Sequence, residues 1–159
     1  MRILIVSDTH GRNNSYLEIV EKWKPLDLVV HCGDVEGSEF LVSQAAGCET
    51  VIVQGNNDYF SQLPREVEME IGKYKVMITH GHPYYVNMGH DFLAKEAAAR
   101  RIDLVMYGHT HRPVIEKKHG VLVMNPGSLT YPRQEGGRPS YIVMEMDSQG
   151  EILAKVHYD

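Results

Sequence analysis

The stretch ILIVSDTHG, residues 3–11, joins an apolar run directly to polar and titratable side chains. The run Ile3–Val6 is continuous rather than alternating, which is typical of a strand that is covered on both faces. Four more short runs have the same character, at residues 28–30, 51–53, 76–78 and 104–106. Helical patterns at residues 13–23, 37–47 and 90–101 separate several of these runs. The alternation predicts an α/β fold.

The helical segments carry signals of their own. We expect one apolar stripe along residues 13–23, formed by Tyr16, Leu17, Ile19, Val20 and Trp23. The segment 37–47 is expected to begin at a Ser38 cap and to end at Gly47. The segment 90–101 is rich in helix formers and places the arginines of residues 100–101 in its last turn.

Other parts of the chain read as antiparallel hairpins. Residues 67–78 form two strand patterns around Gly72-Lys73, a two-residue loop with glycine first. Residues 114–124 and 141–156 are two further candidates, with turns near Gly120 and Gly150. We find no repeat, low-complexity tract or linker, so the sequence predicts a single domain over residues 1–159 with mixed sheets.

Composition excludes several classes of protein. The formal net charge is -5 and the basic residues are scattered, so nothing indicates nucleic-acid binding. No apolar run approaches the roughly 20 residues of a membrane helix, so no membrane partner is expected. The two cysteines, Cys32 and Cys48, form neither a CxxC pair nor a disulfide framework. We therefore expect a cytoplasmic protein, and the sequence leaves a homo-oligomer open.

Each of the five apolar runs is followed by residues that can bind metal. The carboxyl ends of strands form the ligand site in open α/β sheets, so we expect these side chains to meet at one edge. The candidate ligands are Asp8, His10, Asp34, Asn56, His80, His109 and His111. An i, i+2 pair on an extended segment projects to one side, which predicts that Asp8/His10 and His109/His111 each reach the cluster.

The residue types suit a transition-metal site. Imidazole with carboxylate favours Mn, Fe, Co, Ni or Zn, whereas a thiolate site would need cysteines. Seven candidate ligands are too many for one four-coordinate zinc ion and fit two ions that share a carboxylate. Two divalent ions against the charges of Asp8 and Asp34 leave a positive site, which favours an anionic ester.

The ordered motifs carry a family resemblance. SDTHG (7–11), HCGD (31–34), QGNND (54–58), ITHGH (78–82), YGHTH (107–111) and NPGS (125–128) resemble the calcineurin-like binuclear metallophosphoesterases. More narrowly, they resemble the small single-domain bacterial and archaeal phosphodiesterase branch. The resemblance implies a four-layer αββα sandwich of two mixed sheets flanked by helices. It also implies hydrolysis of a small phosphate-ester substrate by a metal-bridging hydroxide.

The same resemblance implies how the ligands divide. The first ion would take Asp8, His10 and His111, and the second would take Asn56, His80 and His109, with Asp34 bridging both. Manganese is the expected metal, with Ni, Co, Fe, Zn and Mg left open.

Three further residues are expected near the substrate. The position after Asn56 is a histidine in the larger phosphatases of the superfamily, whereas here it is Asn57. A carboxamide has no titratable proton near neutral pH, so Asn57 is expected to orient the ester rather than to protonate the leaving group. His82 is a candidate phosphate contact or proton donor. Arg133 is a candidate substrate-binding residue.

We expect a metal-dependent phosphodiesterase. A phosphomonoesterase or nucleotide pyrophosphatase on the same ions is the enzymatic alternative. A non-catalytic interaction scaffold, like the retromer subunit that resembles this fold, is the third reading. None of the seven ligand positions is substituted, which disfavours the scaffold.

Overall fold

The computed structural model describes all residues 1–159, and its backbone forms two mixed five-stranded sheets. In sheet order, the first holds β10 (Ile152–Tyr158), β9 (Ser140–Met146), β1 (Arg2–Val6), β2 (Leu28–His31) and β3 (Glu49–Ile52). The second holds β4 (Glu66–Ile71), β5 (Tyr74–Thr79), β6 (Leu104–Met106), β8 (Val121–Pro126) and β7 (Pro113–Lys118). β1, β2 and β3 run parallel, as do β5, β6 and β8. All five predicted strands are present, although β3 ends one residue earlier than expected.

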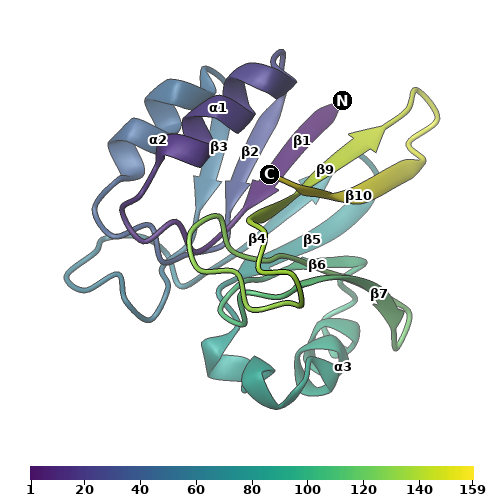
Figure 1. Ribbon diagram of the computed structural model, residues 1–159. Coiled ribbons are helices and arrows are strands. Elements are labelled where there is room, and N and C mark those ends of the chain that lie inside the picture. The colour runs from purple at the N-terminus through teal and green to yellow at the C-terminus, as the bar shows by residue number, and fades with distance from the viewer.

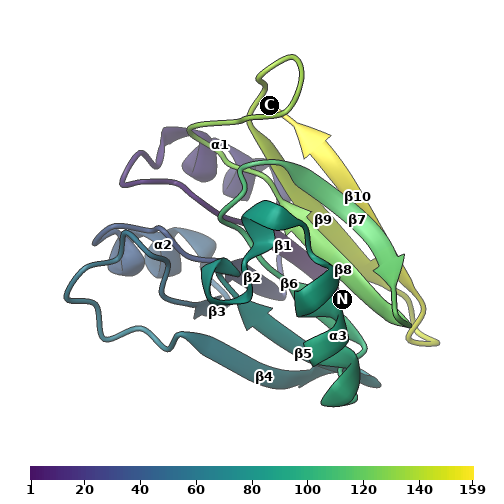
Figure 2. The ribbon, with the colours of Figure 1, turned by 90° about the horizontal axis from the view of Figure 1, so that it is seen from below.

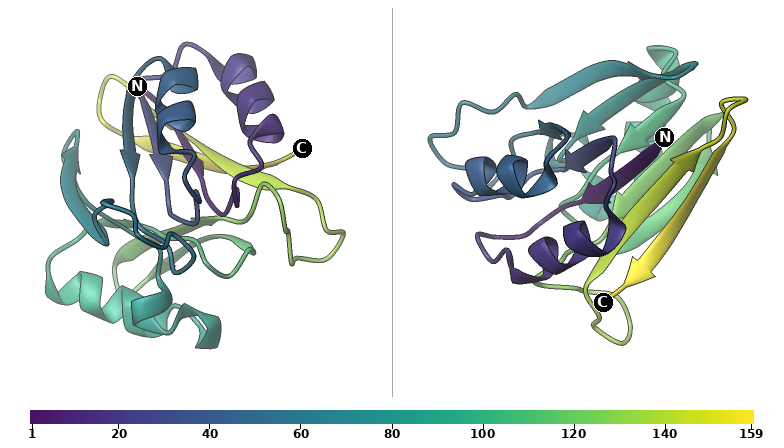
Figure 3. Two further views of the ribbon diagram at one scale, coloured as in Figure 1. Left: turned by 90° about the vertical axis from the view of Figure 1, so that its left-hand side faces the viewer. Right: turned by 90° about the horizontal axis from the view of Figure 1, so that it is seen from above.

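Helices cover the outer face of each sheet. α1 (Asn14–Trp23) and α2 (Glu39–Ala46) lie on the first sheet, and α3 (Asp91–Ala99) lies on the second (Figure 1). Two short 3₁₀ turns, η1 (His82–Tyr84) and η2 (Val86–Met88), connect β5 to α3. The views from below and from the side show the same layering (Figures 2 and 3). The predicted four-layer αββα sandwich is confirmed.

The burial of β1 explains why its sequence does not alternate. Ile3 and Ile5 pack in the cluster between the two sheets, whereas Leu4 and Val6 pack beneath α1 and α2. All four side chains are fully buried. Because both faces of the strand are covered, every position demands an apolar residue.

The three predicted hairpins are confirmed, and two helix predictions are wrong. β4–β5, β7–β8 and β9–β10 pair antiparallel. Leu17 is 37% exposed, because it lies about 100° around the helix from Tyr16 and about 60° from Val20, outside the stripe that Tyr16, Ile19 and Val20 form. α3 ends at Ala99, so the arginines of residues 100–101 lie beyond its last turn. Ser38 occupies the N-cap position of α2 but makes no capping bond, since its hydroxyl accepts from Asn13 Nδ2 instead.

The carboxyl ends of the parallel strands in both sheets lie at one edge of the sandwich. The loops after β1, β2, β3, β5 and β6 meet there, and hydrogen bonds join them: Asp8 N donates to Gly33 O, and Gly108 N donates to His80 O. None of the helices is long and apolar enough to cross a bilayer.

Candidate metal centre

The strand ends turn sharply at the residues that carry the candidate ligands. Asp8, His10, His109 and His111 all have positive φ, between 47° and 69°. The expectation that these pairs lie on extended segments is therefore wrong. Left-handed backbone at each alternate residue, rather than extended pleating, directs the side chains into the cluster.

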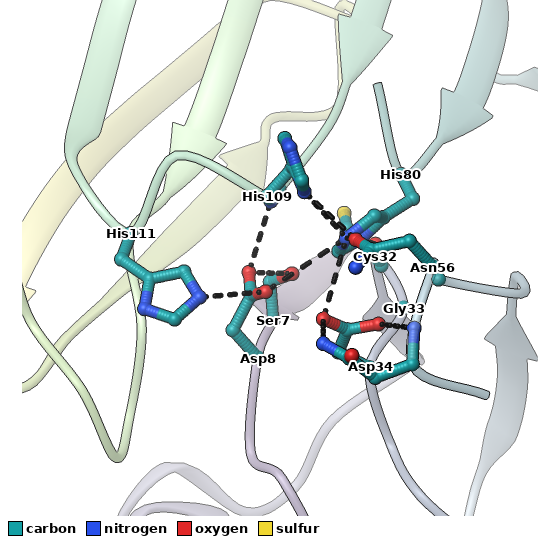
Figure 4. Close-up of polar contacts among 12 residues, drawn as sticks. Ser7, Asp8, Cys32, Gly33, Asp34, Asn56, His80, His109 and His111 are labelled. Atoms are coloured by element: carbon teal, nitrogen blue, oxygen red, sulfur yellow. Dashed lines mark hydrogen bonds and ion pairs between the residues drawn. The ribbon is translucent and has the colours of Figure 1, made fainter. Parts of the chain in front are cut away.

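Asp8 lies at the middle of the cluster and is fully buried. Its Oδ2 accepts hydrogen bonds from Ser7 Oγ at 2.6 Å and from His109 N at 3.1 Å. Its Oδ1 accepts no hydrogen bond, although it is buried. Three imidazole nitrogens face this oxygen: the Nε2 atoms of His111, His10 and His80, at 3.1, 3.9 and 4.0 Å. Figure 4 shows His111 and His80 around Asp8. A buried carboxylate oxygen without a donor is costly unless a cation binds it.

His80 and His111 are held by backbone carbonyls on their outer nitrogens. His80 Nδ1 lies 2.7 Å from Cys32 O, and His111 Nδ1 lies 2.7 Å from Tyr131 O. Each Nδ1 must therefore donate, which leaves each Nε2 as a lone-pair acceptor that faces the carboxylates. An outer hydrogen bond that selects the tautomer in this way is typical of metal-bound histidine.

His10 and His109 have side-chain partners instead. His10 Nδ1 lies 2.7 Å from Glu36 Oε1, and its Nε2 points inward, 3.4 Å from His111 Nε2. His109 is reversed: its Nε2 lies 2.8 Å from the Asn87 carboxamide, and its Nδ1 faces the cluster. Each of the four histidines thus has one nitrogen engaged by a partner outside the cluster and the other nitrogen directed into the cluster.

The second half of the cluster surrounds Asp34, Asn56 and His80. Asp34 Oδ2 lies 3.5 Å from His80 Nε2 and 4.0 Å from His10 Nε2. Asn56 Oδ1 lies 3.0 Å from His80 Nε2 and 2.8 Å from His109 Nδ1. Asp34 therefore lies between the two groups of candidate ligands, with His10 on one side and His80 on the other.

Asn57 contacts Asp34 directly. Its Nδ2 donates to Asp34 Oδ2 at 2.7 Å, and its backbone N–H donates to Asp34 Oδ1 at 2.8 Å. These bonds orient the Asp34 carboxylate. Asn57 therefore has a role besides the expected orientation of the ester, because its side-chain amide holds the carboxylate of a candidate metal ligand in place.

Asp58 braces the loops that carry Asp34 and Asn56. Its carboxylate accepts hydrogen bonds from the backbone N–H groups of Asp34 (2.8 Å), Gly55 (2.7 Å) and Glu36 (2.7 Å). The loops also approach too closely for a side chain at position 55, where a Cβ would lie 2.1 Å from Asp34 Oδ1. This contact explains the glycine at that position.

The charges of the cluster shift several pKa values. Burial alone would raise the pKa of Asp8, but the neighbouring His111 and His80 outweigh it and lower that pKa. The pKa of His109 falls to about 4, because burial and the neighbouring His80 disfavour the imidazolium form. The pKa of His111 is raised: burial opposes the shift, and the Asp8 carboxylate, whose Oδ1 lies 3.1 Å from His111 Nε2, outweighs burial.

The donor set fits divalent transition metals. Two groups have ligand atoms that all lie within 4.8 Å of one another: Asp8, His10 and His111, and Asp8, Asp34 and His80. Both groups combine imidazole with carboxylate, and neither contains a thiolate, since the sulfur of Cys32 belongs to the core between the sheets. The unpartnered Asp8 oxygen and the inward-facing imidazole nitrogens are the oxygen and nitrogen donor atoms that such ions bind.

Comparison with known proteins assigns the family. The model of the calcineurin-like phosphoesterase superfamily domain matches residues 1–149. The chain belongs to this superfamily.

Relatives within the superfamily cover nearly the whole chain. A probable metallophosphoesterase of Methanocaldococcus jannaschii is 32% identical over 98% of this chain and 80% of its own length. Phosphodiesterase YfcE of Escherichia coli is 37% identical over 91% of this chain and 72% of its own length. The crystal structure of a predicted phosphoesterase from Streptococcus pneumoniae superposes with a TM-score of 0.80 at 26% identity, covering 99% of this chain and 97% of the other.

Vps29 shares the fold. The Entamoeba histolytica protein has a TM-score of 0.79 at 20% identity and covers 100% of this chain and 99% of that one. At this identity the likeness concerns the fold alone.

The remaining predicted residues of this calcineurin-like domain lie beside the centre. The His82 ring lies 5.4 Å from the His80 ring and 6.0 Å from the His109 ring, and its buried Nδ1 has no partner. Arg133 is exposed, and its backbone N–H donates to His111 O at 3.0 Å. His82 thus faces the cluster directly, whereas Arg133 lies on the loop behind His111.

Sequence reasoning missed the outer partners of the histidines. Glu36 and Asn87 belong to no motif, and Tyr131 contributes a backbone carbonyl that no sequence pattern marks. Glu36 had one available signal, since it lies two residues after Asp34 on a loop already expected to reach the site. Asn87 and Tyr131 are brought to the site by tertiary packing alone.

Proposed function

We propose that this chain hydrolyses phosphate diesters with two divalent metal ions, manganese foremost. Asp8, His10 and His111 would hold one ion and Asn56, His80 and His109 the other, with Asp34 between them. The observation that most supports this proposal is the orientation of His10, His80 and His111 toward two buried carboxylates, with the outer nitrogen of each imidazole engaged.

Two bound divalent ions would supply a hydroxide nucleophile near neutral pH and withdraw charge from the phosphoryl oxygens. Asp8 and Asp34 contribute only two negative charges, so the loaded site keeps a positive charge that favours an anionic ester. The strand-end loops hold these ligands rigidly, because Asp58 and Asn57 fix both the backbone and the carboxylate of Asp34. The protein itself needs no side-chain nucleophile.

Diesters with good leaving groups are the favoured substrates, because Asn57 has no proton to give. Its Nδ2 is already committed to Asp34 Oδ2 at 2.7 Å. His82 is another polar side chain beside the cluster, its ring 5.4 Å from that of His80, and it is the candidate to contact the phosphoryl group or the leaving oxygen. General acid catalysis contributes about 10²–10⁴-fold, so substrates that need it should react slowly here.

The alternative activities use the same ions and differ in substrate. A phosphomonoesterase or nucleotide pyrophosphatase would favour more highly charged esters or anhydrides. A non-catalytic scaffold would not require all seven ligand positions, and here each histidine also keeps an outer partner. The relatives that carry the name phosphodiesterase support the diester reading.

The test is an activity screen of metal-stripped protein with Mn, Ni, Co, Zn or Mg added back separately. Bis-p-nitrophenyl phosphate should be hydrolysed faster than p-nitrophenyl phosphate, most rapidly with Mn. Asp34→Asn, which keeps the side-chain shape, is the control for contaminating hydrolases and should be inactive. A preference for the monoester, or full activity in Asp34→Asn, would contradict the proposal.

A further inference from the structure

A pocket of about 410 Å³ adjoins the metal centre on the side of His109 and His111. Thr110, which lies between these two histidines in the chain, lines it, and so does Asn87, whose carboxamide is 2.8 Å from His109 Nε2. None of the seven candidate metal ligands lines the pocket. The pocket is therefore adjacent to the metal centre but distinct from it.

Two arginines line this pocket, and no carboxylate does. Arg112 and Arg133 are anchored through their backbones, since Arg112 N donates to Thr110 Oγ1 at 3.3 Å and Arg133 N donates to His111 O at 3.0 Å. Their guanidinium groups form no ion pair. By contrast, the Arg100 guanidinium donates to Glu66 at 2.5 Å and to Glu96 at 2.9 Å. In a chain of formal net charge -5, two unpaired arginines in one pocket make a local positive site.

A second pocket beside the centre has the opposite charge character. It is also about 410 Å³ in volume, and its lining includes Glu36, Glu39, Asn57 and Phe60. Asn57 connects it to the centre through Asp34. The two pockets thus differ in the sign of their charge, since arginines line one and carboxylates line the other.

We infer that the pocket of Arg112 and Arg133 binds a second anionic group of the substrate, and that the substrate is a diester carrying a further phosphate. This inference rests on the proposed function, which puts the scissile diester at the metal centre. Guanidinium groups match phosphate oxygens in a bidentate geometry. Val86 and Val114 also line the pocket and provide an apolar wall for the carbon skeleton between the two charged groups. The pocket of Glu36 and Glu39 would repel the second phosphate, which favours the direction of binding that places this phosphate beside the arginines.

The experiment compares two esters that differ only in that group. One is the p-nitrophenyl ester of thymidine 5′-phosphate, and the other is the same ester with a 3′-phosphate. Hydrolysis releases p-nitrophenol from either one and leaves the phosphomonoester on the 5′ oxygen. With Mn²⁺-loaded protein we expect about tenfold higher kcat/KM for the 3′-phosphorylated ester, since two exposed charge pairs each contribute a few-fold.

The variants are Arg112→Gln/Arg133→Gln and a charge-matched control, Arg101→Gln/Lys117→Gln. Arg101 and Lys117 lie at the end of the second sheet that is remote from the metal centre. Arg101 precedes β6, and Lys117 pairs with Leu122, the partner of the first residue of β6. The control therefore removes two positive charges far from the pocket. The first pair should bring the kcat/KM ratio of the two esters close to one, whereas the control should keep the wild-type ratio. Equal losses on both esters in Arg112→Gln/Arg133→Gln would mean that these arginines bind the scissile phosphate, and the inference would be wrong.

Calorimetry separates this inference from the proposed function. Thymidine 3′,5′-bisphosphate should bind the Mn²⁺-loaded protein about tenfold more tightly than thymidine 5′-phosphate, and the arginine variant should remove the difference. If no diester is hydrolysed with any metal, the proposed function fails while this binding difference still supports the pocket. If diesters are hydrolysed but neither kcat/KM nor affinity responds to the second phosphate, the pocket inference fails alone.

Discussion

Replacing Asp58 with alanine should destabilise the fold and weaken the metal centre together. Asp58 is 3% exposed, and its carboxylate accepts three backbone hydrogen bonds from the loops after β2 and β3. Two of the donors, Asp34 N and Gly55 N, are buried. The third, Glu36 N, is only partly buried.

The size of the effect follows from these three donors. A buried donor left without an acceptor costs about 1–3 kcal/mol, so Asp34 N and Gly55 N together account for roughly 2–6 kcal/mol. Water can reach Glu36 N in part, and removal of a buried charge returns some of its desolvation cost. We therefore expect the free energy of unfolding to fall by about 4 kcal/mol, a large share of the roughly 5–15 kcal/mol of a typical domain.

Urea unfolding followed by circular dichroism, with a chelator present, measures this change without any contribution from bound metal. Asp147→Ala is the matched control. Asp147 also accepts two backbone hydrogen bonds, from Gln149 N (2.8 Å) and Glu151 N (2.9 Å), but in an exposed turn. It should cost less than about 1 kcal/mol, because water replaces the lost acceptor. A loss at Asp58→Ala no larger than that of the control would refute the reasoning.

Four further outcomes are expected. Elemental analysis of Mn²⁺-saturated protein should find two ions per chain. The Asp34→Ala variant should lose binding of both ions, whereas Asp8→Ala should mainly lose binding of one. A chelator should abolish activity while the far-UV circular dichroism signal persists, because the three apolar clusters hold the fold without metal; melting of that signal would make the metal structural. Asn57→His should selectively speed hydrolysis of esters with poor leaving groups, and a wild-type rate indifferent to leaving-group pKa, with chemistry rate-limiting, would contradict this. Lys95 and the other cationic neighbours of Asp91 hold the pKa of that carboxylate well below its usual range, so its stabilising effect is present above pH ~4 and lost as the pH falls further. The difference in urea midpoint between wild type and Asp91→Asn should therefore shrink on acidification, and a gap that stays constant down to pH ~3 would argue against it.

Several parts of the site were predictable from the chain because they depend on local order. A polar residue that closely follows a strand with apolar residues on both faces lies at the carboxyl edge of a sheet, independently of the rest of the fold. Asp8 lies two residues after β1, His80 lies directly after β5, and both belong to the cluster. The bracing role of Asp58 could also be expected, since the turn it stabilises begins only three residues earlier.

The sequence by itself therefore determined the α/β class, the strand ends and the set of residues able to bind metal. Tertiary structure alone decided how these residues face one another. The loops of two different sheets must meet before His111 Nε2 can lie 3.1 Å from Asp8 Oδ1, a contact across more than a hundred residues. The left-handed backbone that aims these side chains, the outer partner Asn87 and the pairing of Arg112 with Arg133 in one pocket also arise only there. The physical reason is that periodicity and turn signals report on neighbouring residues, whereas sheet order and loop packing depend on contacts between distant ones.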